Sequence, residues 1–254
     1  MNVTAHTQEL IAPAKLTLSL HITGLRSDGF HLIEAIMTTL DLHDVLTVID
    51  DSHGLSFTGP FAEGLKNDAS NLVTRALTFV QRSANIVVTK NIPHGGGLGG
   101  GSTDAAAILR WAGRTSPSDV IDSATLGADV PFCLVGGQAQ VSGIGEIIKP
   151  ISLEPQRITL IVPPLHVSTP KVYQAWDAMG GPHSDGPNDL EPAAIQVEPE
   201  LARWRDRIRE VTGDSPVLAG SGATWFVANQ LSEQGQALRE ALPDAYVIET
   251  RTRH

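Results

Sequence analysis

The residues whose spacing could do chemistry begin with a glycine run near the middle of the chain. Six of the seven residues from Gly95 to Gly101 are glycine, and the run passes through Ser102 and Thr103 into an alanine-rich segment. Backbone without Cβ atoms can bring its N–H groups close to a ligand, and the unpaired N–H groups of a first helical turn carry partial positive charge. The pattern predicts a loop that binds phosphate at the start of a helix.

This loop fits neither of the two familiar glycine signatures. Gly95, Gly97 and Gly100 satisfy G-x-G-x-x-G, but so rich a run satisfies it by chance, and the acidic residue expected about 20 positions later would fall in a polar stretch. The pattern G-x-x-x-x-G-K-[ST] fails because Gly101 stands where its lysine belongs. A plain linker is disfavoured by the β-branched run Ile86–Val88 that precedes the loop. If phosphoryl transfer happens here, the cationic group must come from elsewhere in the chain.

Two charged residues far from the loop are candidates for that chemistry. Lys15 lies on the polar face of an alternating segment, Ile11–Ile22, which is typical of a half-buried strand. Asp129 precedes a valine–proline pair that favours extended backbone, so we expect it exposed at the approach to a strand, Phe132–Val135. Taken alone, Lys15 is more often a solvated surface charge, and Asp129 is more often a side chain that satisfies a local turn.

The remaining pattern predicts alternating strands and helices that would position these residues. We expect a short amphipathic segment at 32–40, and a helix at 71–83 with Ser70 as its N-cap. Further helices are expected at 120–126, 171–179, 201–211 and 232–242, and a helical region from 188. Strands are expected at 44–50, 55–57, 86–89, 138–141, 147–148, 157–162, 225–228 and 245–250. We place a domain boundary at 150–156.

Composition restricts the class of protein. A chain of 254 residues can hold one large domain or two smaller ones, and 41% hydrophobic with 18% charged residues is ordinary for a globular enzyme. The formal net charge of -10, without basic clusters, disfavours a nucleic-acid binder. Cys133 is the only cysteine, which excludes an internal disulfide and favours a reducing compartment. Met1–Leu10 lacks an apolar signal region and no apolar run approaches about 18 residues, so we expect a cytoplasmic protein without a membrane partner.

Six short segments together resemble the GHMP small-molecule kinases. The three motifs of that superfamily are matched in order and approximate spacing by Ala12–Leu20, Pro93–Ala106 and Gly220–Thr224. The resemblance extends over nearly the whole chain through Gly24–His31, Leu126–Pro131 and Asn188–Glu191. Within the superfamily the chain is most similar to the branch that phosphorylates a cytidyl-linked methylerythritol. The resemblance implies an α+β fold: a domain of the kind first named for a ribosomal protein at 1–152, and a smaller α+β domain at 153–254.

The resemblance also implies a reaction in the cleft between the domains. The γ-phosphoryl group of ATP, with Mg²⁺, would pass to the 2-hydroxyl of the small-molecule substrate. Asp129 would accept the hydroxyl proton as the oxygen attacks. Lys15 would lie near both Asp129 and the γ-phosphoryl group, where it stabilises negative charge on each.

The binding residues are carried over from the same motifs. The nucleotide-binding positions are Asn71, Leu72, Lys90, Pro93, Gly95, Gly96, Gly97, Leu98, Gly99, Gly100, Gly101, Ser102 and Thr103. The substrate-binding positions are Thr17, Phe30, His31, Gly220, Ser221 and Gly222. By resemblance the Phe30 ring stacks on the cytosine, a contact of about 1–3 kcal/mol, and His31 hydrogen-bonds it. A plain tight turn remains an alternative for the segment that begins at Gly220.

Two alternative functions stay open. The first is a GHMP kinase for another small alcohol, of the mevalonate or homoserine type; Phe30 and His31 disfavour it because those substrates have no base to stack. The second is an inactive nucleotide-binding relative. It is suggested by Thr17 where related enzymes commonly carry asparagine, by His94 where they carry an apolar residue, and by a shortened segment before residue 127. Retention of the lysine and the aspartate disfavours it.

Some properties do not follow from the sequence. We expect Ser102 to contact Mg²⁺ and assign no other protein ligand to it. Asp104 would repel phosphates if it faced them, so we expect it to cap the helix or to act from behind the site. The spacing of the histidines disfavours a zinc site. A monomer and a homodimer remain equally open.

Overall fold

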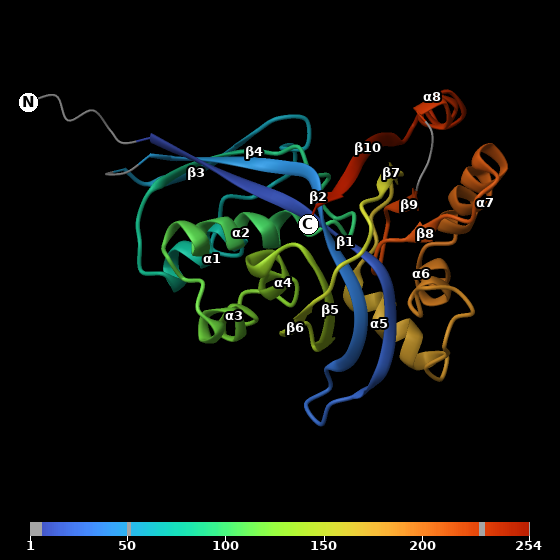
Figure 1. Cartoon of the computed structure of the whole chain (residues 1–254), viewed down its shortest axis with the longest axis horizontal. Helices are drawn as coiled ribbons and strands as arrows, with labels where there is room; N and C mark the ends of the chain where they lie inside the picture. Colours follow the sequence, from blue (N-terminus) through green and yellow to red (C-terminus); the bar gives the residue numbers. More distant parts are fainter. Residues whose placement is uncertain (1–6, 50–51, 229–231, 254) are drawn as a thin grey trace, which may run out of the picture.

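The computed structural model describes residues 7–49, 52–228 and 232–253, and within them the strands form one ten-stranded sheet. Figure 1 shows the elements in order. The strands are β1 (Thr7–Leu25), β2 (His31–Ile49), β3 (Gly54–Thr58), β4 (Asn85–Thr89), β5 (Gln138–Gly143), β6 (Ile147–Pro150), β7 (Arg157–Val162), β8 (Val217–Leu218), β9 (Trp225–Ala228) and β10 (Tyr246–Arg253). The helices are α1 (Leu72–Phe79), α2 (Gly100–Trp111), α3 (Pro117–Ser123), α4 (Val130–Val135), α5 (Thr169–Ala178), α6 (Glu191–Val197), α7 (Glu200–Thr212) and α8 (Ser232–Ala241).

The antiparallel pair β1 and β2 is the frame on which the other elements assemble. Their register runs from Thr7 opposite Ile49 to Leu25 opposite His31. It shifts three times, and two of the shifts lie on either side of the stretch from Lys15 to Thr17. Bulges of this kind bend a strand and re-aim its side chains, which is how a regular strand can direct a polar residue into a site.

The strand β2 corrects one expectation. Residues 32–40 are not a separate amphipathic segment, because β2 runs without interruption from His31 to Ile49. Buried Ile33, Ala35 and Met37 alternate with more exposed neighbours, and each pairs with β1 on one side and β5 on the other. The expected strand at 44–50 is the second half of this element, although residue 50 lies outside the described residues.

The helices α1 to α4 pack beneath the strands of the N-terminal half, and α2 is the central one (Figure 1). Every α2 residue from Thr103 to Leu109 is buried, because alanines let neighbouring elements approach closely on all sides. The cap of α1 is Asn71, whose side chain accepts from the N–H of Val73, and not Ser70 as expected. Ser70 instead bonds Asp68 in the preceding turn.

The expected strand at Phe132–Val135 is wrong, since these residues form α4. A buried apolar run this short is compatible with either a strand or a helix. Pro131 lies in the first turn of α4, where its missing N–H has no intrahelical acceptor in any case. Pro131 biases Val130 toward extended backbone, but packing of the buried α4 residues outweighs this bias and Val130 becomes helical.

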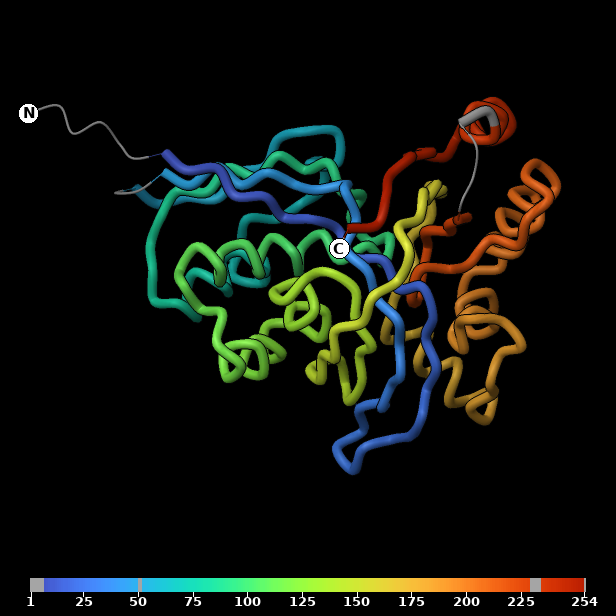
Figure 2. The backbone as a smooth tube through the Cα atoms, in the orientation of Figure 1, coloured from blue at the N-terminus to red at the C-terminus, as the bar shows by residue number. Residues whose placement is uncertain are grey.

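The C-terminal half continues the same sheet. β10 pairs with β7 from Tyr246 to Arg251, and its end pairs with β2 at Thr252 and Arg253. Figure 2 shows the red C-terminal strand reaching the blue strands of the N-terminal half. A single bridge, Leu20 to Asn188, adds a second link. The mixed α+β fold is as expected, while the division into 1–152 and 153–254 stays a prediction. Within the described residues no helix is long and apolar enough to cross a membrane.

Candidate active site

The glycine run forms the predicted loop before a helix. α2 begins at Gly100, and its N-cap residue Gly99 has φ of 68° and offers no side-chain cap. Only a residue without Cβ adopts this left-handed conformation at little cost. The loop is fixed from behind by Thr103, whose hydroxyl donates to the Pro13 carbonyl (2.6 Å). Within the described residues the N-cap position gives no side-chain hydrogen bond to the first N–H groups of α2, and these groups are suited to bind an anion.

The two glycine-rich segments of the chain pack against each other. A Cβ placed on Gly97 would lie 2.3 Å from the carbonyl oxygen of Ala219, and one on Gly96 would lie 2.5 Å from Oγ1 of Thr224. Real Cβ atoms do not approach other atoms this closely, so glycine is required at both positions. The loop before α2 and the turn at 220–222 therefore form one continuous backbone surface.

Lys15 and Asp129 meet in front of the loop. The Lys15 ammonium lies 3.2 Å from Asp129 Oδ2 and donates to Thr17 Oγ1, also at 3.2 Å. The lysine side chain is 6% exposed and the aspartate 34%, so the pair lies at the wall of a cleft and one partner faces solvent. Asp129 occupies the N-cap position of α4 but makes no cap hydrogen bond. Its carboxylate therefore pairs with Lys15 and does not cap the turn that carries it, in contrast to the local-turn alternative.

A single cleft of about 580 Å³ collects much of the predicted site. The predicted residues that line it are Lys15, Thr17, Phe30, His31, Gly97, Ser102, Asp129, Gly220 and Ser221. They come from β1, the turn into β2 and the first residue of that strand, the loop before α2 and the first turn of α2, the N-cap of α4 and the turn after β8. The cleft therefore runs from the glycine surface, past the ion pair, to an aromatic end.

The aromatic end is built by β2 and α5. His31 Nε2 lies 2.8 Å from Asp177 Oδ1, and the His31 ring centroid is 4.7 Å from that of Tyr173. Phe30 is 56% exposed, and the Arg26 guanidinium lies over its ring at 5.3 Å. Burial raises the pKa of Tyr173 to about 12, so its hydroxyl stays protonated. A planar heterocycle with polar edges fits this end of the cleft.

Comparisons with known proteins agree with this geometry. The family model described as GHMP kinases N terminal domain matches residues 71–137. A 4-diphosphocytidyl-2-C-methyl-D-erythritol kinase from Paracoccus denitrificans is 38% identical over 247 residues, with 90% of this chain and 89% of that protein covered. The chain belongs to the 4-diphosphocytidyl-2-C-methyl-D-erythritol kinase family. Its members are small-molecule kinases of the GHMP superfamily.

Solved structures support the same family. The crystal structure of a 4-(cytidine 5'-diphospho)-2C-methyl-D-erythritol kinase is 32% identical, has a TM-score of 0.75, and the match covers 97% of this chain and 100% of that one. A second solved structure, that of L. major mevalonate kinase in complex with R-mevalonate, has a TM-score of 0.70 at 16% identity, and the match covers 98% of this chain and 97% of that one. The second likeness shows the fold alone.

Other predicted nucleotide-binding positions of this kinase family member lie outside the cleft lining. They are Asn71, Leu72, Lys90, Pro93, Gly95, Gly96, Leu98, Gly99, Gly100, Gly101 and Thr103, together with Gly222 from the substrate set. Asn71 is engaged as the cap of α1. Gly95 lies beside the ring of His166, because a Cβ there would be 3.2 Å from Nδ1. Most of these residues belong to the glycine loop and the start of α2, and Leu72 of α1 lies beside them, because a Cβ on Gly101 would be 3.4 Å from its Cδ1.

Lys90 has a structural environment that the sequence does not reveal. Its ammonium contacts the carboxylates of Asp44 and Asp104, and all three side chains are almost fully buried. Asp44 also accepts from the N–H groups of Asn91 (2.6 Å) and Ile92 (2.8 Å), at the entrance to the loop. Burial would lower the pKa of Lys90, but the two carboxylates outweigh it and raise that pKa. The cluster ties β2, the end of β4 and α2 together behind the loop.

Asp104 faces away from the loop surface, into this cluster. Its pKa is raised to about 7 by burial, against the stabilising charge of Lys90, with a further increase from the neighbouring Asp44. Its Oδ1 is buried with no hydrogen-bond partner in the described part of the chain. Among the described residues, no group of three or more histidine, cysteine or acidic side chains could hold a metal ion.

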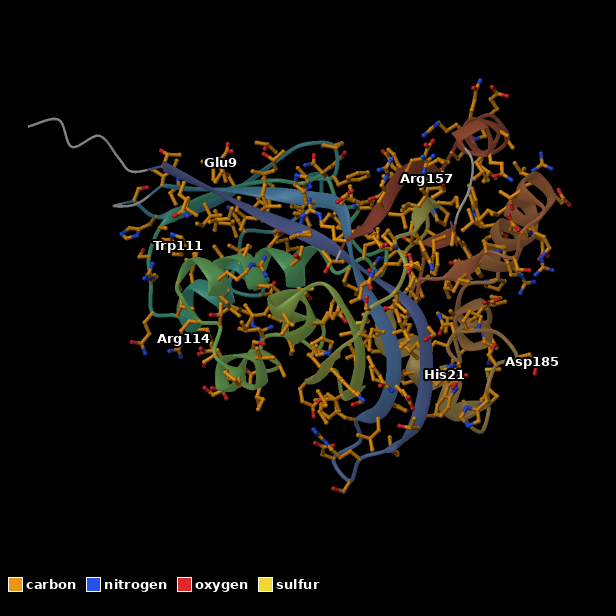
Figure 3. All side chains as sticks on the ribbon, viewed as in Figure 1. Glu9, His21, Trp111, Arg114, Arg157 and Asp185 are labelled. Atoms are coloured by element: carbon orange, nitrogen blue, oxygen red, sulfur yellow. The ribbon has the colours of Figure 1, made fainter. Side chains whose placement is uncertain are left out.

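The turn at 220–222 is held by Asn188. Its side-chain amide donates to the carbonyls of Leu218 (2.9 Å) and Gly220 (2.7 Å), and its oxygen accepts from the N–H of Leu190. The next residue, Asp189, is buried, and burial would raise its pKa, but bonds from the Ser184 and Ile22 amides and two histidines lower it. One of the histidines is His21 on β1, beside the loop that carries Asp185 (Figure 3).

Sequence reasoning missed the contribution of α5. Thr169, Tyr173 and Asp177 all line the cleft, and Thr169 Oγ1 lies 2.7 Å from Ser221 Oγ. The three residues are spaced four apart on α5, so they share one face. Tyr173 and Asp177 lie within the predicted helix 171–179, whereas Thr169 lies before it. That spacing was a usable signal, but it does not indicate which side of a helix faces a ligand.

Proposed function

We propose that this protein transfers the γ-phosphoryl group of ATP to the 2-hydroxyl of 4-diphosphocytidyl-2-C-methyl-D-erythritol. The observation that carries the proposal is the 3.2 Å contact between Lys15 and Asp129, in the cleft that has the glycine surface on one side and the Phe30–His31 end on the other. Membership of the kinase family supports the substrate.

The ion pair suits the chemistry of an attacking alcohol. Asp129 accepts the hydroxyl proton on a carboxylate oxygen while the alcohol oxygen forms its bond to the γ-phosphorus, and the bond from that phosphorus to the bridging oxygen of ADP breaks. An ammonium has three N–H donors, and two of those of Lys15 point to Asp129 and Thr17. The third can stabilise negative charge on the group in transfer.

The uncapped start of α2 fits the phosphates of ATP. The free N–H groups after Gly99 and the Cβ-free surface at Gly96 and Gly97 would hold them. Mg²⁺ normally keeps several waters and is bound with substrate phosphates, where it neutralises their charge. Ser102, which lines the cleft, is the protein group we assign to it, since Asp104 is engaged by Lys90. We further propose that the protein acts in the cytoplasm, as a monomer or homodimer.

Substrate competition tests the function. ADP release is measured with the purified protein, ATP and Mg²⁺, and with either the cytidyl substrate, 2-C-methyl-D-erythritol 4-phosphate, mevalonate or homoserine. The position of the new phosphate is read by ³¹P NMR of the product. Turnover should be confined to the cytidyl compound and should modify its 2-hydroxyl. Equal turnover of the other alcohols, or no turnover of any of them, would refute the proposal.

A further inference from the structure

The aromatic end of the cleft contains a carboxylate that phosphoryl transfer does not use. Asp177 Oδ1 lies 2.8 Å from Nε2 of His31, and the exposed fractions of the two side chains are 51% and 11%. We infer that Asp177 is a positioning residue that fixes the His31 ring so that the site selects cytosine over uracil. This inference rests on the cytidyl substrate proposed above.

The position of one proton on His31 follows from its partner. A carboxylate accepts hydrogen bonds and does not donate them, so Nε2 of His31 carries a proton. The ring is also held by Tyr173 and by Trp176, whose ring lies edge-on with centroids 5.5 Å apart. Nδ1 has no hydrogen-bond partner within the residues that the structure describes. Nε2 of His31 therefore donates to Asp177, and Nδ1 is available to a ligand.

The fixed ring can distinguish the two pyrimidines. Cytosine presents an amino donor beside a ring-nitrogen acceptor, whereas uracil presents a carbonyl acceptor beside an N–H donor. A neutral His31 offers an acceptor at Nδ1, which pairs with the cytosine amine but opposes the uracil carbonyl at the same position. Because Asp177 keeps the proton on Nε2, Nδ1 of the neutral ring stays an acceptor. The mismatch with the uracil carbonyl then leaves two polar groups unpaired, which costs affinity.

Without the carboxylate this discrimination should be lost. Asparagine at position 177 can accept from a protonated Nε2 or donate to an unprotonated one, so His31 could place its proton on either nitrogen and meet either base. Asp177→Asn keeps the shape of a half-exposed side chain and is therefore a mild change to folding. Asp177→Ala frees the ring completely. We expect the preference for cytosine to fall at least tenfold in both variants.

Nucleotide binding measures the preference directly. Calorimetric titrations of the full-length protein with CDP and with UDP, each in the presence of saturating ADP, give the ratio of the two Kd values. The wild type should prefer CDP by about 10–100-fold, the range expected for one mismatched buried polar contact. The control is Asp206→Asn, which removes a similarly exposed carboxylate paired with Arg205 on α7. The control should keep the wild-type ratio.

Two outcomes would overturn the inference. If both Asp177 variants weaken CDP and UDP equally, the carboxylate only holds α5 against β2. If Asp177→Asn lowers the ratio further in a His31→Gln background, the carboxylate contacts the base itself instead of acting through His31. ¹⁵N NMR of the wild-type ring should show the proton on Nε2, and a proton on Nδ1 alone would also refute the inference. Absence of phosphoryl transfer would refute the proposed function, while the binding ratio still decides the role of Asp177.

Discussion

Gly97→Ala tests whether the two glycine-rich segments form one surface. Gly97 has φ of 78°, and a Cβ there would lie 2.3 Å from the Ala219 carbonyl oxygen. The matched control is Gly113→Ala, at the far end of α2, where φ is 75° and a Cβ would have nothing within 4 Å. Both variants force alanine into the left-handed region, and only one brings it against backbone.

The expected magnitudes separate the two effects. Alanine in the left-handed region costs about 1–2 kcal/mol, which both variants share. Overpacking against groups that cannot move away costs about 1–3 kcal/mol more, which only Gly97→Ala should show. For a chain of this size each kcal/mol lowers Tm by about 2–4 °C, so Gly97→Ala should melt about 2–12 °C below Gly113→Ala.

Two measurements check this prediction. Urea unfolding and thermal melts give the stability difference, and the KM for ATP shows whether the loop has moved. Gly97→Ala should raise the KM for ATP several-fold because the loop must shift away from Ala219, while Gly113→Ala should leave it unchanged. If the two variants have equal stability and equal KM values, the two glycine segments do not depend on each other, and the reasoning fails.

Three further predictions concern the charges of the site. Asp129→Asn and Lys15→Ala should each lower kcat by about 10²–10⁴-fold while calorimetric ATP binding is largely retained; unchanged turnover in Asp129→Asn would exclude it as the base. The pKa of Asp104 is raised from 3.8 to about 7, so the folded state binds its proton more tightly and loses that stability as the pH rises through this window. The urea midpoint should therefore fall less between those pH values in Asp104→Asn than in the wild type, and identical slopes would contradict the assignment. Chelation of divalent metal by EDTA should abolish turnover and excess Mg²⁺ should restore it; undiminished turnover in EDTA would exclude the proposed metal.

The sequence predicted the elements with strong local signals. The loop before α2 follows from its glycines, and the strand Trp225–Ala228 has the predicted bounds. Local signals were insufficient for Phe132–Val135, because four apolar residues have no measurable period. The full length of β2 was missed because the polar residues Asp41 and His43 interrupt its hydrophobic pattern, so the sequence reads as two shorter segments.

The site was predictable only in part, for a physical reason. Motifs identified residues whose type is fixed by the chemistry, such as Lys15 and Asp129, and the structure brings these two together. Contacts between residues distant in sequence leave no such trace. The buried partners of Lys90 are 46 and 14 positions away, and Asp177 is 146 positions from His31. Each of these contacts forms only when the chain packs into its tertiary fold, so no short stretch of sequence predicts it.

The missing lysine of the glycine loop has a structural explanation. A Cβ on Gly99 would lie 2.7 Å from Cγ of Lys15, so the absence of a side chain at the start of α2 leaves room for the lysine stem of β1 to cross it. The Lys15 N–H also donates to the Leu98 carbonyl (3.1 Å), which fixes the strand against the loop. The loop has no lysine of its own because its backbone packs against Lys15 of β1, which supplies the ammonium group instead. This arrangement places the ammonium between the anion-binding N–H groups and Asp129, where charge develops during phosphoryl transfer.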